Sequence, residues 1–412
     1  MSIVLEEMQR LSPAAEIWWD SSPLDFPRWR DQFLAGAPDR ASRERWEGRL
    51  RTFLCPDDPD VSLVRGVTTN PSLVARSVLA TPGPWEEWID RTVRAQPLPD
   101  LDHTFHLVYE EALRRAARAM RPMWEATGGR YGWVSGQLDP RLMFHAGAMT
   151  EQGLRIARIA PNLMVKVPGS AAGYQTIRTL VGHGISVNNT LSYTVPQFLA
   201  CVDAVNGGLR DAARRGVDTT RWRAVFTHMI GRFGANTDLL HEAAARDVEL
   251  TATDLRWGEI AVLKRVHRLI AEHGHPVKPL LSSLETDDPA QGFGGLSMHL
   301  EHSAGGSVAY TCKPQFVADV VRREAELPRL DAQAIHADVP EQVLDKLMWL
   351  PSFQRGYLTD GMSADQFAHY GAFTATYAEV LGNTRRLLDF VARRFQALSS
   401  RARPLSLSGH PR

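Results

Sequence analysis

The stretch Pro161-Asn-Leu-Met-Val-Lys166-Val-Pro-Gly-Ser170 decides how the rest of the chain is interpreted. Its middle is a short, nearly continuous apolar run that a proline and a glycine close, as in a parallel strand covered on both faces. Lys166 lies inside this run, where burial favours the neutral amine that attacks a carbonyl to form a Schiff base. Taken alone, the stretch also fits an edge strand whose lysine reaches solvent.

Length, charge and cysteine content restrict the class of protein. The 412 residues can form one barrel-sized domain with additions or two smaller domains. Lysine plus arginine and aspartate plus glutamate both number 47, so no nucleic-acid or membrane surface is indicated. No apolar run approaches membrane-spanning length, and the N-terminus lacks the pattern of a signal peptide. With three widely spaced cysteines, Cys55, Cys201 and Cys312, we expect a cytoplasmic protein.

Apolar segments and helical patterns alternate eight times along the chain. Strands are expected at residues 16–20, 63–70, 131–137, 163–168, 185–190, 223–232, 277–283 and 307–313. This rhythm predicts the α/β class and a (β/α)8 TIM barrel. We expect one domain over residues 1–412, with a helical insertion at about 25–54 and extra C-terminal helices at about 335–402 packed on the barrel. The last ten residues, about 403–412, are expected to be disordered.

Several segments at the ends of these strands carry a family likeness. They are Gly66-Val-Thr-Thr-Asn70-Pro-Ser-Leu, Leu163-Met-Val-Lys166-Val-Pro and Ile185-Ser-Val-Asn188-Asn-Thr190-Leu, to which Val134-Ser-Gly-Gln137-Leu-Asp139-Pro-Arg-Leu and Gly231-Arg232 add. In this order they resemble transaldolase, a barrel of the class I Schiff-base aldolase type. The resemblance runs from about Asp20 to Arg232 and fades in the insertion and beyond Ser283.

The resemblance implies a role for each matching residue. Lys166 matches the Schiff-base lysine, and Asp20 matches the acid that moves the proton of the hydroxyl at the broken bond. Thr190 matches the threonine that holds the catalytic water, and Gln137 stands where its partner is found. Substrate-binding positions are implied at Asn70, Asn188, Thr227, Arg232 and Ser283, with Arg232 in the place of an arginine that grips the sugar phosphate.

The chemistry needs these residue types. A ketose donor forms an iminium at Lys166, which accepts electrons when the C3–C4 bond breaks, while a carboxylate at Asp20 takes and returns the hydroxyl proton. A guanidinium at Arg232 can bind phosphate through two hydrogen bonds.

Five of these positions also have a purely structural explanation. Asn70 can cap the helix that begins at Pro71, and Asp20 can cap a turn. Asn188 and Thr190 can be hydrogen-bonding residues at a strand end, and Arg232 can form a surface ion pair.

Two positions depart from the family pattern. Transaldolases carry a glutamate where this chain has Gln137, and an amide can orient water but cannot take its proton. Fructose-6-phosphate aldolase, a smaller relative, also has glutamine there but depends on a tyrosine whose nearest counterpart is Met229. The adjacent His228 is therefore a candidate acid or base. Glu285 stands near the place of a second phosphate-binding arginine, with Lys313 as a candidate replacement, so the acceptor can differ from the usual one.

We expect no metal and no organic cofactor. The histidine pairs 103/106 and 299/302 lack a third ligand, and the glycines at 292–295 form no nucleotide-binding motif.

The expected function is transfer of a three-carbon dihydroxyacetone unit from a ketose phosphate, fructose 6-phosphate or sedoheptulose 7-phosphate, to an aldose. The pentose phosphate pathway and a specialised acceptor in secondary metabolism both remain open. An aldolase that releases dihydroxyacetone and an inactive barrel used for binding or regulation are the alternatives. The expected partners are small sugar phosphates rather than nucleic acid or membrane, and a homodimer is left open.

Overall fold

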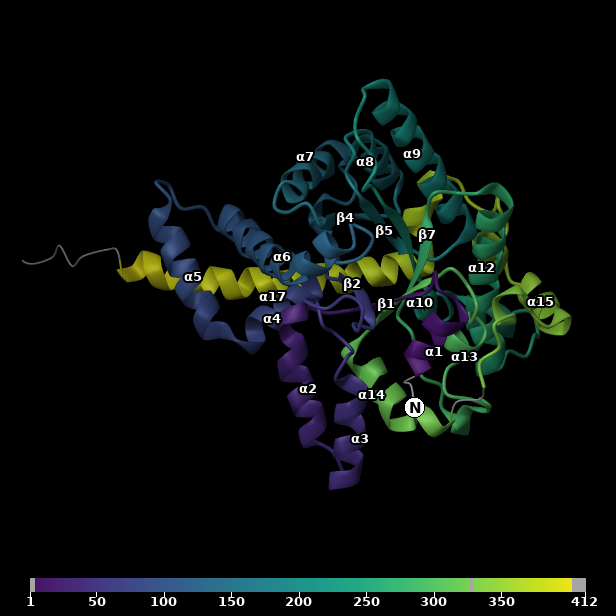
Figure 1. Cartoon of the computed structure of the whole chain (residues 1–412). Helices are drawn as coiled ribbons and strands as arrows, with labels where there is room; N and C mark the ends of the chain where they lie inside the picture. The colour runs from purple at the N-terminus through teal and green to yellow at the C-terminus, as the bar shows by residue number, and fades with distance from the viewer. Residues whose placement is uncertain (1–3, 327–328, 402–412) are drawn as a thin grey trace, which may run out of the picture.

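A computed structural model describes residues 4–326 and 329–401 and shows a closed barrel of eight parallel strands in chain order (Figure 1). The strands are β1 (Glu16–Trp19), β2 (Val64–Thr68), β3 (Trp133–Gln137), β4 (Leu163–Pro168), β5 (Val187–Ser192), β6 (Ala224–Met229), β7 (Lys278–Ser282) and β8 (Ala309–Cys312). The expected (β/α)8 barrel is therefore confirmed.

Helices connect and surround the strands. They are α1 (Val4–Leu11), α2 (Phe26–Ala35), α3 (Arg40–Leu50), α4 (Pro71–Ala80), α5 (Pro82–Ala95), α6 (Leu101–Ala126), α7 (Ala146–Ala157), α8 (Ala171–Gly182), α9 (Val195–Arg214), α10 (Ile230–Ala235), α11 (Leu239–Ala244), α12 (Ala252–His273), α13 (Met298–Glu301), α14 (Pro314–Arg323), α15 (Glu341–Met348), α16 (Pro351–Tyr357) and α17 (Gly371–Arg401). Short 3₁₀ helices are η1 (Pro23–Asp25), η2 (Pro140–Leu142), η3 (Pro289–Gln291), η4 (Glu324–Glu326), η5 (Ala334–His336) and η6 (Ala364–His369).

The sixth strand shows the largest difference from the sequence-based prediction. It ends at Met229, and Arg232 lies on the short helix α10 rather than on a strand. Further along, residues 239–273 form two helices, α11 and α12, because Thr251 and Asp254 form a capping box that starts a new helix.

Side chains inside the barrel form an apolar layer below a polar one. Apolar side chains from six of the eight strands form the lower layer, namely Trp18, Trp133, Met164, Val225, Leu280 and Ala309. Gly66 faces this layer, where an added Cβ would lie 2.6 Å from the Trp18 ring. The barrel is thus a packed core, and only its ends offer open space.

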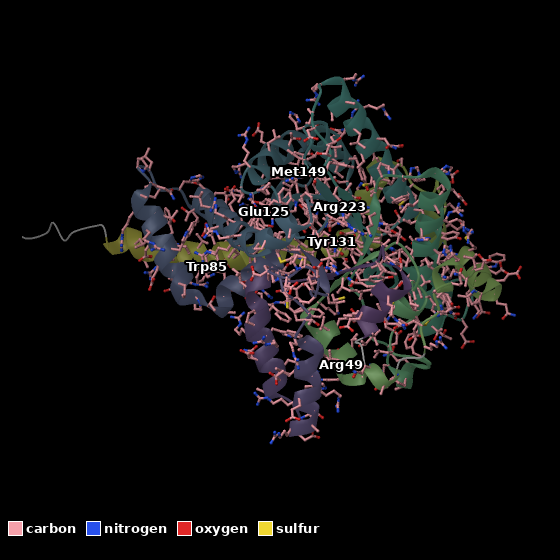
Figure 2. The ribbon with its side chains drawn as sticks, in the orientation of Figure 1. Arg49, Trp85, Glu125, Tyr131, Met149 and Arg223 are labelled. Atoms are coloured by element: carbon pink, nitrogen blue, oxygen red, sulfur yellow. The ribbon has the colours of Figure 1, made fainter. Side chains whose placement is uncertain are left out.

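The insertion and the C-terminal helices lie outside the barrel. Helices α2 and α3 project from it as a pair, and Arg49 (labelled in Figure 2) joins α3 to η4 through a 2.9 Å ion pair with Glu324 (Figure 1). Helix α17 runs across the molecule and packs against α4, α5 and α6 (Figure 1). The predicted extra C-terminal helices are therefore present. The residues predicted to be disordered, 403–412, lie outside the described residues. No helix within the described ranges is long and apolar enough to cross a membrane.

Candidate active site

A cavity of about 420 Å³ opens at the C-terminal ends of the strands. Its wall is made by strand ends, by α4 and α10, and by α17, and includes Asp20, Asn70, Ser72, Arg76, Gln137, Lys166, Thr190, Met229, Arg232, Ser283, Glu285, Lys313, Thr376 and Glu379. Seven of the ten predicted site residues thus meet in one place, because parallel strands bring their C-terminal ends to the same edge of the barrel. The other three, described below, do not line it.

Lys166 lies at the bottom of this cavity on a strand buried along its whole length. The lysine is 6% exposed, and the strand register places it between Gln137 on β3 and Asn188 on β5. Burial lowers the pKa of the amine, and the charge of Arg232 lowers it further, whereas Asp20 opposes the shift. The amine is therefore biased toward its neutral, nucleophilic form.

Asp20 follows β1 and faces the same cavity. Its Oδ1 accepts a 2.6 Å hydrogen bond from the Thr68 hydroxyl, which also contacts the Thr311 hydroxyl. Burial raises the pKa of Asp20, although Lys166 and Thr68 oppose the rise. The carboxyl and the amine are thus close enough to interact, and both are biased toward their neutral forms, in which they can exchange protons with a ligand.

Asn70 caps a helix and also lines the cavity. Its Oδ1 accepts a 2.9 Å hydrogen bond from the Leu73 backbone, so the predicted N-cap is confirmed. Gln137 is 3% exposed, and its backbone N–H donates to the Tyr109 hydroxyl at 3.0 Å. The side chains of Gln137 and Thr190 form no hydrogen bond with another described residue. Both therefore have polar atoms left to bind a ligand.

The two cations at the outer wall are already paired with carboxylates. Arg232 donates to both oxygens of Glu379 on α17, at 2.6 and 3.1 Å. Lys313 donates to Glu285 at 2.7 Å. By contrast, Arg76 on α4 is exposed and forms no ion pair within the described part of the chain. An anion that enters the cavity therefore meets one unpaired guanidinium and two cations that already hold a carboxylate.

Asn188 and Thr227 were predicted to hold substrate hydroxyls, but neither lines the cavity. Thr227 Oγ1 donates to Asn188 Oδ1 at 2.6 Å, and Asn188 Nδ2 donates to Ser135 Oγ at 2.8 Å. Both side chains are buried inside the barrel, where these hydrogen bonds satisfy them. In this structure they support the strands around Lys166 instead of facing the open space.

His228 was a candidate acid or base, and the structure does not bring it to the site. Along β6 the inward positions are Val225 and Thr227, so His228 points outward into the helical layer, with no exposed surface. Neither ring nitrogen has a hydrogen-bonded partner among the described residues. Burial lowers the pKa of His228 to about 3, with the nearby His299 adding to the shift and the Tyr193 backbone opposing it. The ring therefore stays neutral near pH 7 and cannot reach a ligand in the cavity.

Several residues of the cavity wall were not predicted, among them Ser72, Arg76, Thr376 and Glu379. Ser72 and Arg76 lie one helical turn apart on α4, the helix that Asn70 caps. Their positions relative to this cap were a signal in the sequence that could have revealed them. Thr376 and Glu379 belong to α17. The sequence predicted that C-terminal helices pack on the barrel, but no local pattern indicated that one of them reaches this cavity.

The histidine pairs that were dismissed as metal sites have other partners. His106 Nε2 lies 3.2 Å from Asp139, and His299 Nε2 lies 2.8 Å from Glu259. Over residues 4–326 and 329–401 no group of three or more metal-binding side chains gathers.

A family model described as transaldolase/fructose-6-phosphate aldolase matches residues 59–288, more than half of the chain. This range holds β2 to β7 and most of the cavity wall. The chain belongs to this family. Glu379 and Lys313 lie outside the matched range, and so does Asp20.

Individual members of the family show the same relationship. The chain is 30% identical to transaldolase 1 of Streptomyces avermitilis over 242 residues, which is 55% of this chain and 63% of that protein. It is 30% identical to transaldolase 2 of Streptomyces coelicolor over 223 residues (53% and 58%), and 32% identical to transaldolase of Mycobacterium ulcerans over 196 residues (46% and 51%). The match thus covers less than two-thirds of each of these relatives.

Proposed function

We propose that the chain transfers a three-carbon dihydroxyacetone unit from a ketose phosphate to an aldose through a Schiff base at Lys166. The observation that carries this proposal is a buried lysine with a lowered pKa that faces a buried carboxyl, Asp20, in the cavity of a transaldolase-family barrel. Fructose 6-phosphate and sedoheptulose 7-phosphate are the proposed donors.

The reaction then proceeds in two halves. The neutral amine of Lys166 attacks the ketose carbonyl, and the protonated carboxyl of Asp20 gives its proton to the departing hydroxyl. Loss of water thus leaves an iminium on the lysine and a carboxylate at Asp20. Asp20 takes the C4 hydroxyl proton as the C3–C4 bond breaks, which releases an aldehyde and leaves an enamine on the lysine. The enamine attacks the acceptor aldehyde, Asp20 returns the proton, and hydrolysis frees the product.

Arg232 is the proposed donor-phosphate residue, and its present partner must then be displaced. Glu379 is about half exposed, and an exposed ion pair of this kind contributes little free energy. A phosphate dianion carries more charge than one carboxylate and can accept both guanidinium hydrogen bonds. We therefore propose that Glu379 holds Arg232 in the free enzyme and yields it to the donor.

Release of free dihydroxyacetone is the second candidate activity, and Gln137 favours it. This amide lies beside Lys166 in the cavity, and the family includes fructose-6-phosphate aldolase. Donor cleavage measured with and without an acceptor aldehyde separates the two activities, because only an aldolase turns over without acceptor.

Borohydride trapping tests the proposal directly. The chain has only five lysines, Lys166, Lys264, Lys278, Lys313 and Lys346, so peptide mass mapping can assign an adduct unambiguously. Reduction in the presence of fructose 6-phosphate should add a donor-derived mass to Lys166 alone. Lys166→Met should abolish both the adduct and turnover.

Lys313→Met is the matched control because Lys313 lies in the same cavity but is partly exposed and paired with Glu285. This variant should still form the adduct on Lys166. An adduct on another lysine, or turnover without Lys166, contradicts the mechanism. No adduct and no turnover in the folded wild-type protein with any ketose phosphate supports the inactive barrel instead.

A further inference from the structure

A second cavity, of about 390 Å³, lies at the opposite end of the barrel from Lys166. Its wall comes from the N-terminal ends of β1, β6 and β7 and from the segment before β3, and includes Glu16, Gly129, Arg130, Tyr131, Arg221, Trp222, Arg223 and Lys278. Figure 2 shows Tyr131 and Arg223 close together over the barrel. A third cavity of the same size adjoins it, and Trp222, Arg223 and Lys278 line both.

Four cationic side chains but only one carboxylate line this cavity. Glu16 accepts hydrogen bonds from Arg223 at 2.6 Å, from Lys278 at 2.9 Å and from the Trp18 indole at 3.0 Å. Its carboxylate is buried and fully occupied by these three donors. Glu16 therefore compensates only part of the positive charge of the cavity.

The other two cations, Arg130 and Arg221, have no carboxylate partner within 4 Å in the described part of the chain. Arg130 lies over the Tyr131 ring at 5.0 Å, and Arg221 lies over the Trp124 ring at 5.1 Å. Asp218 is near enough to Arg221 to respond to its charge but does not line the cavity. Both guanidiniums are exposed, so their hydrogen-bonding groups can turn toward a ligand.

We infer that this cavity at the N-terminal end of the barrel binds a small polyanion that carries at least two phosphate charges. Arginine forks match phosphate oxygens bidentately, and the cavity has the size of a small-molecule site. The guanidiniums of Arg65 and Arg130 both lie over the Tyr131 ring, at 4.8 and 5.0 Å, so this ring holds two cations at the same end of the barrel. The site is separate from the active-site cavity and needs none of its residues.

Calorimetric titration with inorganic pyrophosphate tests this inference without measuring activity. The double variant Arg130→Gln/Arg221→Gln removes the two unpaired cations, and loss of even one charged hydrogen bond typically weakens binding about tenfold or more. We expect the affinity of this variant to fall at least tenfold. Arg232→Ala, which alters only the active-site cavity, should retain this binding.

Arg43→Gln/Arg45→Gln is the matched control, since it removes two exposed arginines from α3, which projects away from the barrel. Unchanged binding in this control, together with loss in the cavity variant, supports the site. Equal loss in both double variants would show nonspecific charge attraction and overturn the inference. Binding that is lost only with Arg232→Ala, or absent from the folded wild-type protein at millimolar pyrophosphate, would overturn it as well.

Discussion

Burial, more than any single neighbour, controls the chemistry of Lys166 and Asp20. Each of the two side chains favours the ionised form of the other, but desolvation is the larger effect on both. The amine loses its proton more readily, and the carboxyl holds its proton more tightly, than either would in water. Burial of this pair therefore shifts both groups toward the forms that a nucleophile and an acid need.

Gln137 provides the first test at the scale of one residue. The strand register places it beside Lys166, where it can orient water but cannot remove a proton from it. Gln137→Glu should therefore accelerate Schiff-base formation, by about a hundredfold if the new base reaches the lower end of typical general-base assistance. Single-turnover trapping of the adduct against pH measures this rate.

Glutamate and glutamine have nearly the same shape, so Gln137→Glu should leave the packing unchanged. The unfolding temperature of the variant checks this, because a loss of packing would lower it. An unchanged trapping rate in the folded variant would assign Gln137 to substrate recognition rather than proton transfer.

Whether a strand residue faces the barrel interior or the surrounding helices explains which site residues could be predicted from the sequence. Lys166, Gln137 and Thr190 occupy inward positions near strand ends, and motif order was enough to bring them together. His228 does not reach the site because it directly follows the inward-facing Thr227, and neighbouring residues of a strand face opposite sides of the sheet. Asn188 and Thr227 do face inward, but their mutual hydrogen bond depends on side-chain geometry that no sequence pattern encodes.

At the scale of elements, helix α17 changes the charge around Arg232. Glu379 of this helix pairs with Arg232, so the helix contributes a carboxylate to the place proposed for the donor phosphate. The amphipathic pattern of the helix was visible in the sequence. Its packing on the barrel was predicted, but its approach to the site was not, because docking onto α4, α5 and α6 depends on contacts between segments about 300 residues apart.

Glu379→Gln should improve binding of phosphorylated donors. Exposed ion pairs typically contribute about 0.2–1 kcal/mol, so removing this competitor should lower the KM for fructose 6-phosphate by about 1.4- to fivefold. The KM for unphosphorylated dihydroxyacetone should not change, because this substrate carries no phosphate. Steady-state kinetics with both substrates measures the ratio.

Two control variants separate this effect from a general change in charge. Glu285→Gln removes a carboxylate from the same cavity without freeing Arg232. Arg232→Ala should raise the KM for fructose 6-phosphate alone. If Glu379→Gln shifts both substrates equally, Glu379 does not compete with phosphate.

For the whole molecule, the closed barrel separates two charged ends by a packed apolar layer. The C-terminal end holds Lys166 and the proposed chemistry, and the N-terminal end holds Glu16 and its surplus of cations. The eightfold alternation was enough to predict the barrel, since parallel strands joined by helices leave few other closed arrangements. The cavity proposed to bind a polyanion could not be predicted, because its residues are scattered over four segments that only the closed barrel brings together.

Histidines that are wholly or partly buried outside the barrel make the stability of the whole molecule depend on pH. Burial lowers the pKa of His228 to about 3 and that of His267 and His302 to about 4, and it also lowers the pKa of His299. In the unfolded chain these rings protonate near pH 6.5. The unfolded state therefore binds more protons than the folded state below that pH, and the free energy of unfolding must fall as the pH decreases.

His228 is fully buried and gives the clearest test of this dependence. Between pH 6.5 and its folded pKa of about 3, it should cost about 1.4 kcal/mol of stability for each pH unit, or about 2 kcal/mol at pH 5. His228→Leu removes the titrating ring and its two unpaired nitrogens. Urea unfolding at pH 7 and pH 5 should show a smaller loss in this variant than in the wild type. The test compares, for each protein, the difference in the free energy of unfolding between pH 7 and pH 5. A change in stability that the substitution causes equally at both pH values therefore does not affect the result. An equal loss in both proteins would mean that His228 gains a proton without unfolding, which its burial should prevent.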